Sequence, residues 1–284
     1  MMRHFFGIVL VLSAAACDDA VVRQATPAGP TEPSPRTVSY SVRIVSGADG
    51  SPVRGAAVVI EGQTLESGDD GRVDVVLPFG AWATDVTAVG FLPRRTTTAA
   101  NQTIALWPIA SEAEADAVRR MVYERGAQPD GFLFPPDSDQ FLLTITDTSD
   151  TNSPAWSDAW RREATAFGSM FGVHYALSYV FQYETNEVAV TFSPASAAGC
   201  VPVKAWGFCR DSPWYRSFTV LPEKALDPTT IRRVLASWFL GPNPLPGFMN
   251  PDAPADSLSP LEIQTIRMIL QRTRKNRWPD DDRF

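Results

Sequence analysis

Between Val38 and Trp107, apolar and polar residues alternate along short runs, the pattern of strands that bury one face. Glycine and aspartate cluster between these runs, as expected for tight turns. The runs are Val38–Ile44, Ala56–Glu61, Val73–Leu77, Ala81–Ala88 and Thr103–Trp107. Short strands at this spacing predict a small antiparallel all-β sandwich over residues 38–108.

After residue 108 the apolar residues recur at steps of three and four, which favours helices. Capping residues and first-turn prolines predict helix starts at Ser111, Ser153, Asp227 and Ser259, the third helix ending at Gly241. We interpret the aromatic stripe of the second helix as core packing; it comprises Trp156, Trp160, Ala164, Phe167 and Phe171. Strands are expected at Phe141–Thr146, Ala176–Tyr183, Glu187–Phe192 and Ser217–Leu221. The pattern predicts an α+β domain over residues 109–284, with a charged, frayed tail after Arg272.

The N-terminus has the order of a secretory signal over residues 1–16: a positive start, an apolar run and small residues before Cys17. The apolar run is too short to span a membrane. Because three alanines precede Cys17, the segment resembles the lipobox of bacterial lipoproteins, in which the cysteine is lipidated. A cleaved signal peptide with an unmodified cysteine is the alternative. Residues 17–37 would then be the lipidated cysteine and a Pro-rich tether, and we expect an exported protein anchored to a bacterial membrane, periplasmic or at the cell surface.

Composition restricts the chemistry further. The chain has 25 Lys and Arg against 32 Asp and Glu, a formal net charge of −7, which argues against nucleic acid as a partner. With only two histidines in 284 residues, a site with several histidine ligands is excluded. In an exported protein, Cys200 and Cys209 on either side of a short segment predict a disulfide, with catalytic or metal-binding thiols as the alternative.

Two resemblances add to this pattern. Residues 50–58, 68–73 and 89–91 resemble the transthyretin-like domain called carboxypeptidase regulatory-like. That family implies a spacer or packing partner and brings no catalytic residue. Residues 227–236, 247–251 and 258–262 are similar to bacterial matrixin-like zinc peptidases of the metzincin class. Together the resemblances imply a two-domain protein, an all-β sandwich followed by an α+β metzincin-like domain.

A metzincin needs the motif HExxHxxGxxH, whose histidines hold Zn²⁺ and whose glutamate activates a water molecule, and this motif is absent. In one register the ligand and glutamate positions hold Ser237, Trp238, Gly241 and Gly247; in the other they hold Val234, Leu235, Trp238 and Pro244. Met249 corresponds to the methionine of the family's Met-turn, which does no chemistry itself. The resemblance therefore implies a degenerate active-site region at Ser237, Trp238, Gly241 and Met249, with no catalytic residue, metal or cofactor.

The function expected from these features is that of a non-catalytic pseudopeptidase, which binds protein or peptide or serves as a structural component of the cell envelope. Trp206 and Phe208, between the two cysteines, are the candidate edge for an extended peptide, which such edges bind by β-augmentation. The expected partners are the membrane, through the lipid anchor, and an extended peptide or envelope protein. The alternative is a metallopeptidase-like hydrolase with an atypical active site, which predicts stoichiometric zinc or chelator-sensitive cleavage.

Overall fold

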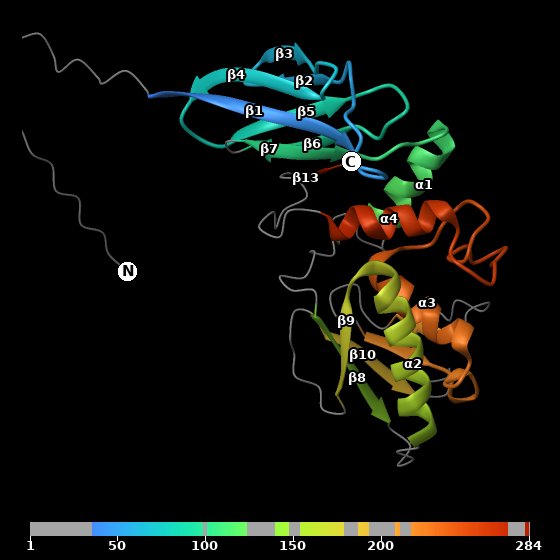
Figure 1. Cartoon of the computed structure of the whole chain (residues 1–284). Helices are drawn as coiled ribbons and strands as arrows, with labels where there is room; N and C mark the ends of the chain where they lie inside the picture. Colours follow the sequence, from blue (N-terminus) through green and yellow to red (C-terminus); the bar gives the residue numbers. More distant parts are fainter. Residues whose placement is uncertain are drawn as a thin grey trace, which may run out of the picture. The chain divides into compact units, whose positions relative to one another are not determined.

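The computed structural model describes residues 36–98, 101–123, 140–147, 154–178, 187–192, 208–210, 217–271 and 282–283. Thr37–Phe284 form one compact unit, separate from Met1–Arg36. Within the described residues, strands and helices are mixed, with three β-sheets and four α-helices (Figure 1). No helix in these ranges is long and apolar enough to cross a membrane. The signal peptide and Cys17 lie outside the described residues, and the boundary between residues 108 and 109 stays a prediction.

Two sheets form the first part of the compact unit. In the first sheet, β1 (Thr37–Ser46) lies between β4 (Arg72–Pro78) and β7 (Gln102–Leu106). The second sheet is antiparallel and has the order β13 (Asp282–Arg283), β6 (Arg94–Thr98), β5 (Trp82–Thr87), β2 (Ala57–Ile60) and β3 (Gln63–Glu66). One cluster of buried side chains takes residues from both sheets, among them Val42, Val73, Ile104, Val58 and Val86.

The five strands predicted for this part are confirmed, but two more strands are present. β3 has one apolar residue, Leu65, and β6 is the sequence Arg-Arg-Thr-Thr-Thr, so neither shows an apolar alternation. The expectation of a purely antiparallel arrangement is wrong for one pair, since β1 and β7 run parallel. The chain passes through β5 and β6 of the other sheet before β7, so no hairpin forces β7 to be antiparallel to β1.

The tail expected to be frayed is ordered at two of its residues. Asp282 and Arg283 form β13, which pairs with Thr96 and Arg95 of β6. β6 therefore has a neighbour on each side, because β5 pairs with its other edge. A two-residue strand carries no apolar pattern, so only the pairing itself reveals it.

The third sheet has the order β11 (Phe208–Arg210), β12 (Ser217–Val220), β10 (Glu187–Phe192), β8 (Gln140–Asp147) and β9 (His174–Ser178). Its strands are parallel except β11, which is antiparallel to β12. Three of the four strands predicted here are confirmed, and β11 is additional. Of the predicted strand Ala176–Tyr183, residues 176–178 lie in β9 and the rest lie outside the described residues. A parallel neighbour requires a crossover, which α2 (Pro154–Phe171) supplies between β8 and β9.

The four described α-helices share one hydrophobic cluster with this sheet, and α2 lies alongside its strands (Figure 1). Besides α2 they are α1 (Glu112–Tyr123), α3 (Pro228–Phe239) and α4 (Pro260–Leu270), and a 3₁₀ turn, η1 (Pro222–Lys224), precedes α3. The aromatic stripe of α2 packs as predicted: Trp160, Ala164 and Phe167 are buried. The indole Nε1 of Trp160 donates a hydrogen bond to Ala225 O at 3.0 Å, so even its polar atom is satisfied in the core.

At each helix whose predicted first residue is described, side chains close in sequence accept hydrogen bonds from the first backbone N–H groups. At α1, Ser111 Oγ accepts from Glu114 N at 3.2 Å, and Glu114 Oε2 accepts from Ala110 N at 2.7 Å. At α4, Ser259 and Glu262 form the predicted capping box. Each bond satisfies a backbone N–H that has no partner inside the helix.

Candidate functional site

Helix α3 carries Ser237 and Trp238 of the predicted degenerate active-site region, and Asp227 fixes where this helix begins. The Asp227 carboxylate accepts hydrogen bonds from Thr229 N and Thr230 N, both at 3.3 Å, and from Thr230 Oγ1 at 2.7 Å. Partial burial opposes the charge of Asp227, but the bonds from Thr230 and Thr229 and the nearby charge of Lys224 outweigh it and lower the pKa of the carboxyl. The helix is thus capped by an ionised carboxylate.

The residues at the predicted degenerate site are buried. Trp238 is 2% exposed, and its ring lies 6.2 Å from that of Tyr175 and 5.4 Å from that of Phe239, centroid to centroid. Burial raises the pKa of the Tyr175 hydroxyl above its ordinary value, so this group stays neutral. Gly241 N donates to Met121 O of α1 at 2.7 Å. These contacts are those of a packed core.

Ser237, on the neighbouring position of α3, is also buried, and no described residue makes a hydrogen bond to its Oγ. Met249 lies after α3 and is 0% exposed. Met249 O accepts a hydrogen bond from Asn243 N at 2.8 Å. Met249 therefore contacts a residue that lies only two positions after Gly241 in the sequence. The fold therefore brings the end of α3 and the Met249 turn together.

Glu262 holds that turn, a role that sequence reasoning missed. Its carboxylate is 0% exposed. It accepts hydrogen bonds from Asn243 Nδ2 at 3.0 Å, Phe248 N at 3.1 Å and Met249 N at 2.8 Å, in addition to Ser259 N at 2.7 Å. Of these bonds, the predicted capping box accounts only for the one from Ser259 N. The other donors lie 13 to 19 residues before Glu262, so no local pattern reveals them.

Arg233, on the buried side of α3, binds the same turn from the other direction. It is 7% exposed, and it donates from Nε to Phe248 O at 3.2 Å and from Nη2 to Ala255 O at 3.0 Å. Its guanidinium lies 4.8 Å from the centroid of the Phe248 ring, a cation–π contact. Burial lowers the pKa of Arg233, although the charges of Asp227, Asp256 and Glu262 oppose this shift. A charge held by two carbonyl groups and a ring makes the turn rigid.

Gly247 is required where the turn approaches Glu262. A Cβ at this position would lie 2.7 Å from Glu262 Oε1 and 2.8 Å from Asn243 Nδ2, closer than non-bonded atoms approach. In the first of the two registers, this residue stands at the third histidine position. Any side chain there would displace the carboxylate that holds the turn.

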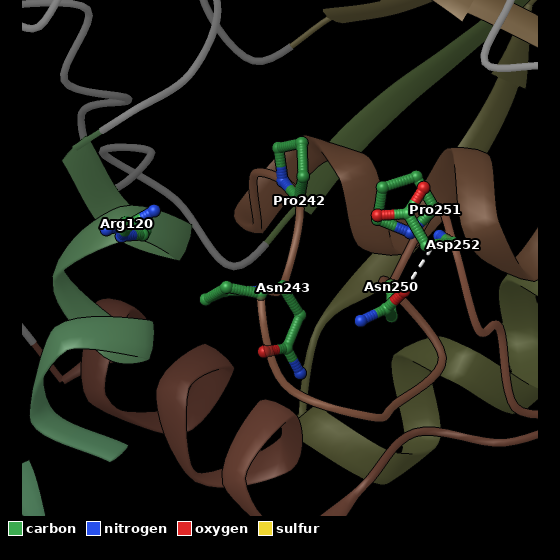
Figure 2. Close-up of a pocket in the computed structure, with 7 residues that line it drawn as sticks. Arg120, Pro242, Asn243, Asn250, Pro251 and Asp252 are labelled. Atoms are coloured by element: carbon green, nitrogen blue, oxygen red, sulfur yellow. Dashed lines mark hydrogen bonds between the residues drawn. The ribbon is translucent and has the colours of Figure 1, made fainter. Parts of the chain in front are cut away.

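A shallow pocket of about 170 Å³ opens beside the turn, between α1 and the loop that follows α3. Figure 2 shows its wall, which includes Arg120, Pro242, Asn243, Asn250, Pro251 and Asp252. The amide of Asn250 is engaged within the loop, since its Oδ1 accepts from Asp252 N at 2.8 Å (Figure 2) and its Nδ2 donates to Leu245 O at 2.9 Å. Arg120 is paired with Asp116 at 2.9 Å. The pocket thus offers a ligand two exposed charges of opposite sign, Arg120 and Asp252.

Among the described residues, no group of three or more His, Cys, Asp or Glu side chains is placed to hold a metal ion. His174 begins β9 and is exposed. Within these ranges, the ligand and glutamate positions of either register contain hydrophobic, hydroxyl, glycine or proline residues.

The candidate peptide-binding edge is described in part. Phe208 begins β11, which lies at the end of the strand order in its sheet and is antiparallel to β12, with Phe208 opposite Val220. Cys209 follows it in the same strand. Trp206 and Cys200 lie outside the described residues, so the disulfide and the role of Trp206 stay predictions.

No family model and no curated protein matches this chain. Among solved structures, it is similar over 49% of its length to a Bacteroides fragilis protein of unknown function that is described as membrane-associated. That similarity has 14% sequence identity and a TM-score of 0.21 and covers 53% of the other protein. The match thus spans about half of that protein's length, and at this TM-score nothing about fold or function is carried over from it.

Proposed function

We propose that this protein is a membrane-anchored lipoprotein of the cell envelope whose C-terminal domain is a metzincin-like fold without a zinc site, used to bind an extended peptide or protein segment. In this proposal Cys17 carries the lipid and residues 38–108 form a transthyretin-like β-sandwich that acts as a spacer. The cluster that combines apolar residues of both N-terminal sheets supports the sandwich.

The order of elements supports the metzincin-like assignment. After β8, the chain forms α2, two further parallel strands, the antiparallel β11, the parallel β12, then α3, the turn with Met249, and α4. This is the order of helix, strands, hairpin, strand, helix, Met-containing turn and helix that the resemblance implies. Residues 179–186, 193–207 and 211–216 are not described, so the hairpin between β10 and β12 is compared only through β11.

The observation that carries the proposal is how the region around α3 is filled. A peptidase of this class needs an open position on its metal, at which a water molecule is activated. Here Trp238 stands at a catalytic position in both registers, and its indole is packed against Tyr175 and Phe239. The following turn is closed by the hydrogen bonds that Phe248 N and Met249 N donate to Glu262 and that Arg233 Nε donates to Phe248 O. These contacts give the region a structural purpose that needs no metal.

The binding part of the proposal is supported by the place of β11. A strand at the end of a sheet presents backbone N–H and C=O groups to which an extended segment can add. Phe208 lies in this strand, whose other edge pairs with β12.

Metal content and peptidase activity of the purified chain that begins at Asp18 test the first part. We expect less than about 0.1 zinc per chain and no chelator-sensitive cleavage of casein, because the sequence lacks the histidine motif and the described residues contain no group of three metal-binding side chains. One zinc per chain, or cleavage that EDTA abolishes, contradicts the proposal and favours a hydrolase.

A comparison of variants tests the binding part. The double variant Trp206→Ala and Phe208→Ala should lose envelope proteins that are captured by the parent chain after cross-linking in the native envelope. Val89→Ala is the matched control, since Val89 is a fully exposed apolar residue in the N-terminal sheets. If the double variant and the control capture the same proteins as the parent, the edge is not a binding site.

A further inference from the structure

The connection between β4 and β5 presents an aromatic ring to solvent. We call residues 78–82, Pro-Phe-Gly-Ala-Trp, which connect β4 of the first sheet to β5 of the second, the 78–82 loop. Phe79 is 79% exposed, and Val76, which precedes the loop on β4, is 63% exposed. Large apolar side chains with this exposure cost free energy in water, so a contact that covers them would be favourable.

Hydrogen bonds fix the backbone of the 78–82 loop on either side of Phe79. The hydroxyl of Tyr40, a residue 1% exposed, accepts from Gly80 N at 2.9 Å and lies 3.0 Å from Gly80 O. The indole Nε1 of Trp82 donates to Pro78 O at 3.1 Å. The backbone on either side of Phe79 is therefore held in place, so a contact at this loop costs little backbone entropy.

The charge around the 78–82 loop differs from that at the opposite end of the same strands. No residue from Val75 to Thr84 is charged. The turn before β4 contains Asp69 and Asp70, and the turn after β1 contains Asp49. The first of these turns is joined to the far part of β1 through Ile44 N and Gly71 O at 2.7 Å. One end of the strands is thus acidic by one net charge, since Arg54 pairs with Asp69 and Arg72 with Asp70, and the other end has no charged residue from Val75 to Thr84.

The chain enters its compact unit beside the uncharged end. In the register of β1 and β4, Thr37 lies opposite Pro78, so the residue that follows the tether is next to the 78–82 loop. If Cys17 is lipidated, a polyproline-like segment between Cys17 and Thr37 would span about 60 Å at about 3.1 Å per residue. The 78–82 loop is therefore within reach of the surface that holds the anchor, at the end of the unit where the tether is attached.

We propose that the 78–82 loop is a lipid-contact site, in which Phe79 inserts at the head-group level of the membrane that holds the anchor, with Val76 and Trp82 beside it. The apolar ring of Phe79 gains free energy by leaving water, and the indole of Trp82 suits this depth because one end is apolar and the other carries an N–H group. An uncharged end avoids the cost of bringing carboxylates to an anionic bilayer, which the acidic end would incur. This inference rests on the membrane attachment proposed above, and it adds an orientation: the N-terminal sheets stand with this end toward the lipid.

The test compares Phe79→Trp with Val89→Trp. Both residues are exposed apolar positions of the N-terminal sheets, but Val89 lies between β5 and β6 at the acidic end. The chain from Asp18, which keeps the whole compact unit, is carried on vesicles of phosphatidylcholine and phosphatidylglycerol by an N-terminal hexahistidine tag and a nickel-chelating lipid. Tag anchoring makes the result independent of whether Cys17 is lipidated.

Quenching by phospholipids brominated near the head group is the readout, corrected for the parent chain. We expect quenching of the new tryptophan in Phe79→Trp and none in Val89→Trp. Without the tag, Phe79→Ser should lower the vesicle partition coefficient roughly five- to tenfold, since one aromatic ring is removed from the interface. Equal quenching of both variants, or none at position 79, overturns the proposal. A dimer in sedimentation that Phe79→Ser abolishes also overturns it, because the ring would then be covered by a second copy.

Discussion

The N-terminal sheets and the turn between α3 and α4 are stabilised in different ways. The sheets bury aliphatic side chains such as Ile44, Val58 and Val86, which are 0% exposed and have no polar atoms. The turn is held by the charged side chains of Glu262 and Arg233, which are buried to a similar degree. Burying an aliphatic side chain gains free energy roughly in proportion to area, whereas a buried charge is tolerated only while every partner is present. We therefore expect graded losses in the sheets and abrupt losses at the turn.

The largest expected effect is at the turn. Glu262→Ala leaves the N–H groups of Phe248 and Met249 buried without their acceptor, and it should destabilise the protein by about 4 kcal/mol or prevent folding. Glu262→Gln keeps the shape but places an amide among donors, and we expect it to lose at least about 2 kcal/mol. Urea unfolding measures both changes.

Glu114 is the matched control for Glu262, because it caps α1 from the corresponding helix position. It accepts one hydrogen bond, from Ala110 N, near the surface. Glu114→Gln should therefore cost about 0.5 kcal/mol. Similar losses for Glu114→Gln and Glu262→Gln would contradict the role assigned to Glu262.

A graded series is expected in the sheets. Ile44→Val removes one methyl group from the cluster and should cost about 1 kcal/mol, and Ile44→Ala about 3 kcal/mol, since the cost follows the volume removed. Urea unfolding of the two variants measures the ratio. If Ile44→Val costs as much as Ile44→Ala, the sheets are not held by simple apolar burial.

Two glycines whose backbone angles lie outside the left-handed region give a further comparison. Gly247→Ala should cost about 2 kcal/mol, because the new Cβ would lie against Glu262 and Asn243. Gly80→Ala should be nearly neutral, since the nearest atoms of Trp82 lie 3.7 Å from the position of its Cβ. Thermal unfolding distinguishes the two, and a neutral Gly247→Ala would show that the turn can move away from α4.

The smallest effect concerns the cap of α3 and its dependence on pH. Asp227→Ala should cost about 1 kcal/mol at pH 7. Because folding lowers the pKa of Asp227, the contribution of its charge is present above the unfolded pKa and is lost as the pH falls through the folded pKa. The difference between the parent and Asp227→Ala should therefore shrink below about pH 4. A constant difference from pH 7 to pH 3 would exclude a role for the charge.

How much of the fold could be predicted from the sequence depends on how far apart in the chain the interacting residues lie. Helix starts are set by side chains two or three residues from the backbone groups they satisfy, so Asp227 and Ser259 identified α3 and α4 correctly. β6 was not predicted because its inward residues include Arg94, whose Nη1 donates to Ala105 O at 2.9 Å. An arginine that is buried by a backbone partner in another strand does not follow the apolar alternation that indicates strands.

The candidate site was predicted only in part for the same reason. The motif spacing located α3 and Met249, and the burial of Trp238 agrees with a core position. The bonds of Arg233 and Glu262 to the turn span 13 to 22 residues, and neither residue type nor spacing reveals them. Buried charges that hold a turn become visible only when the chain is folded.

The most direct measurement is the unfolding temperature of the purified chain with and without metal. If Glu262 and Arg233 hold the turn, the midpoint should change by less than about 1 °C in EDTA or with added zinc, because no metal binds the folded state preferentially. A midpoint that falls by more than about 5 °C in EDTA and recovers with zinc would contradict this, since a metal would then be part of the fold.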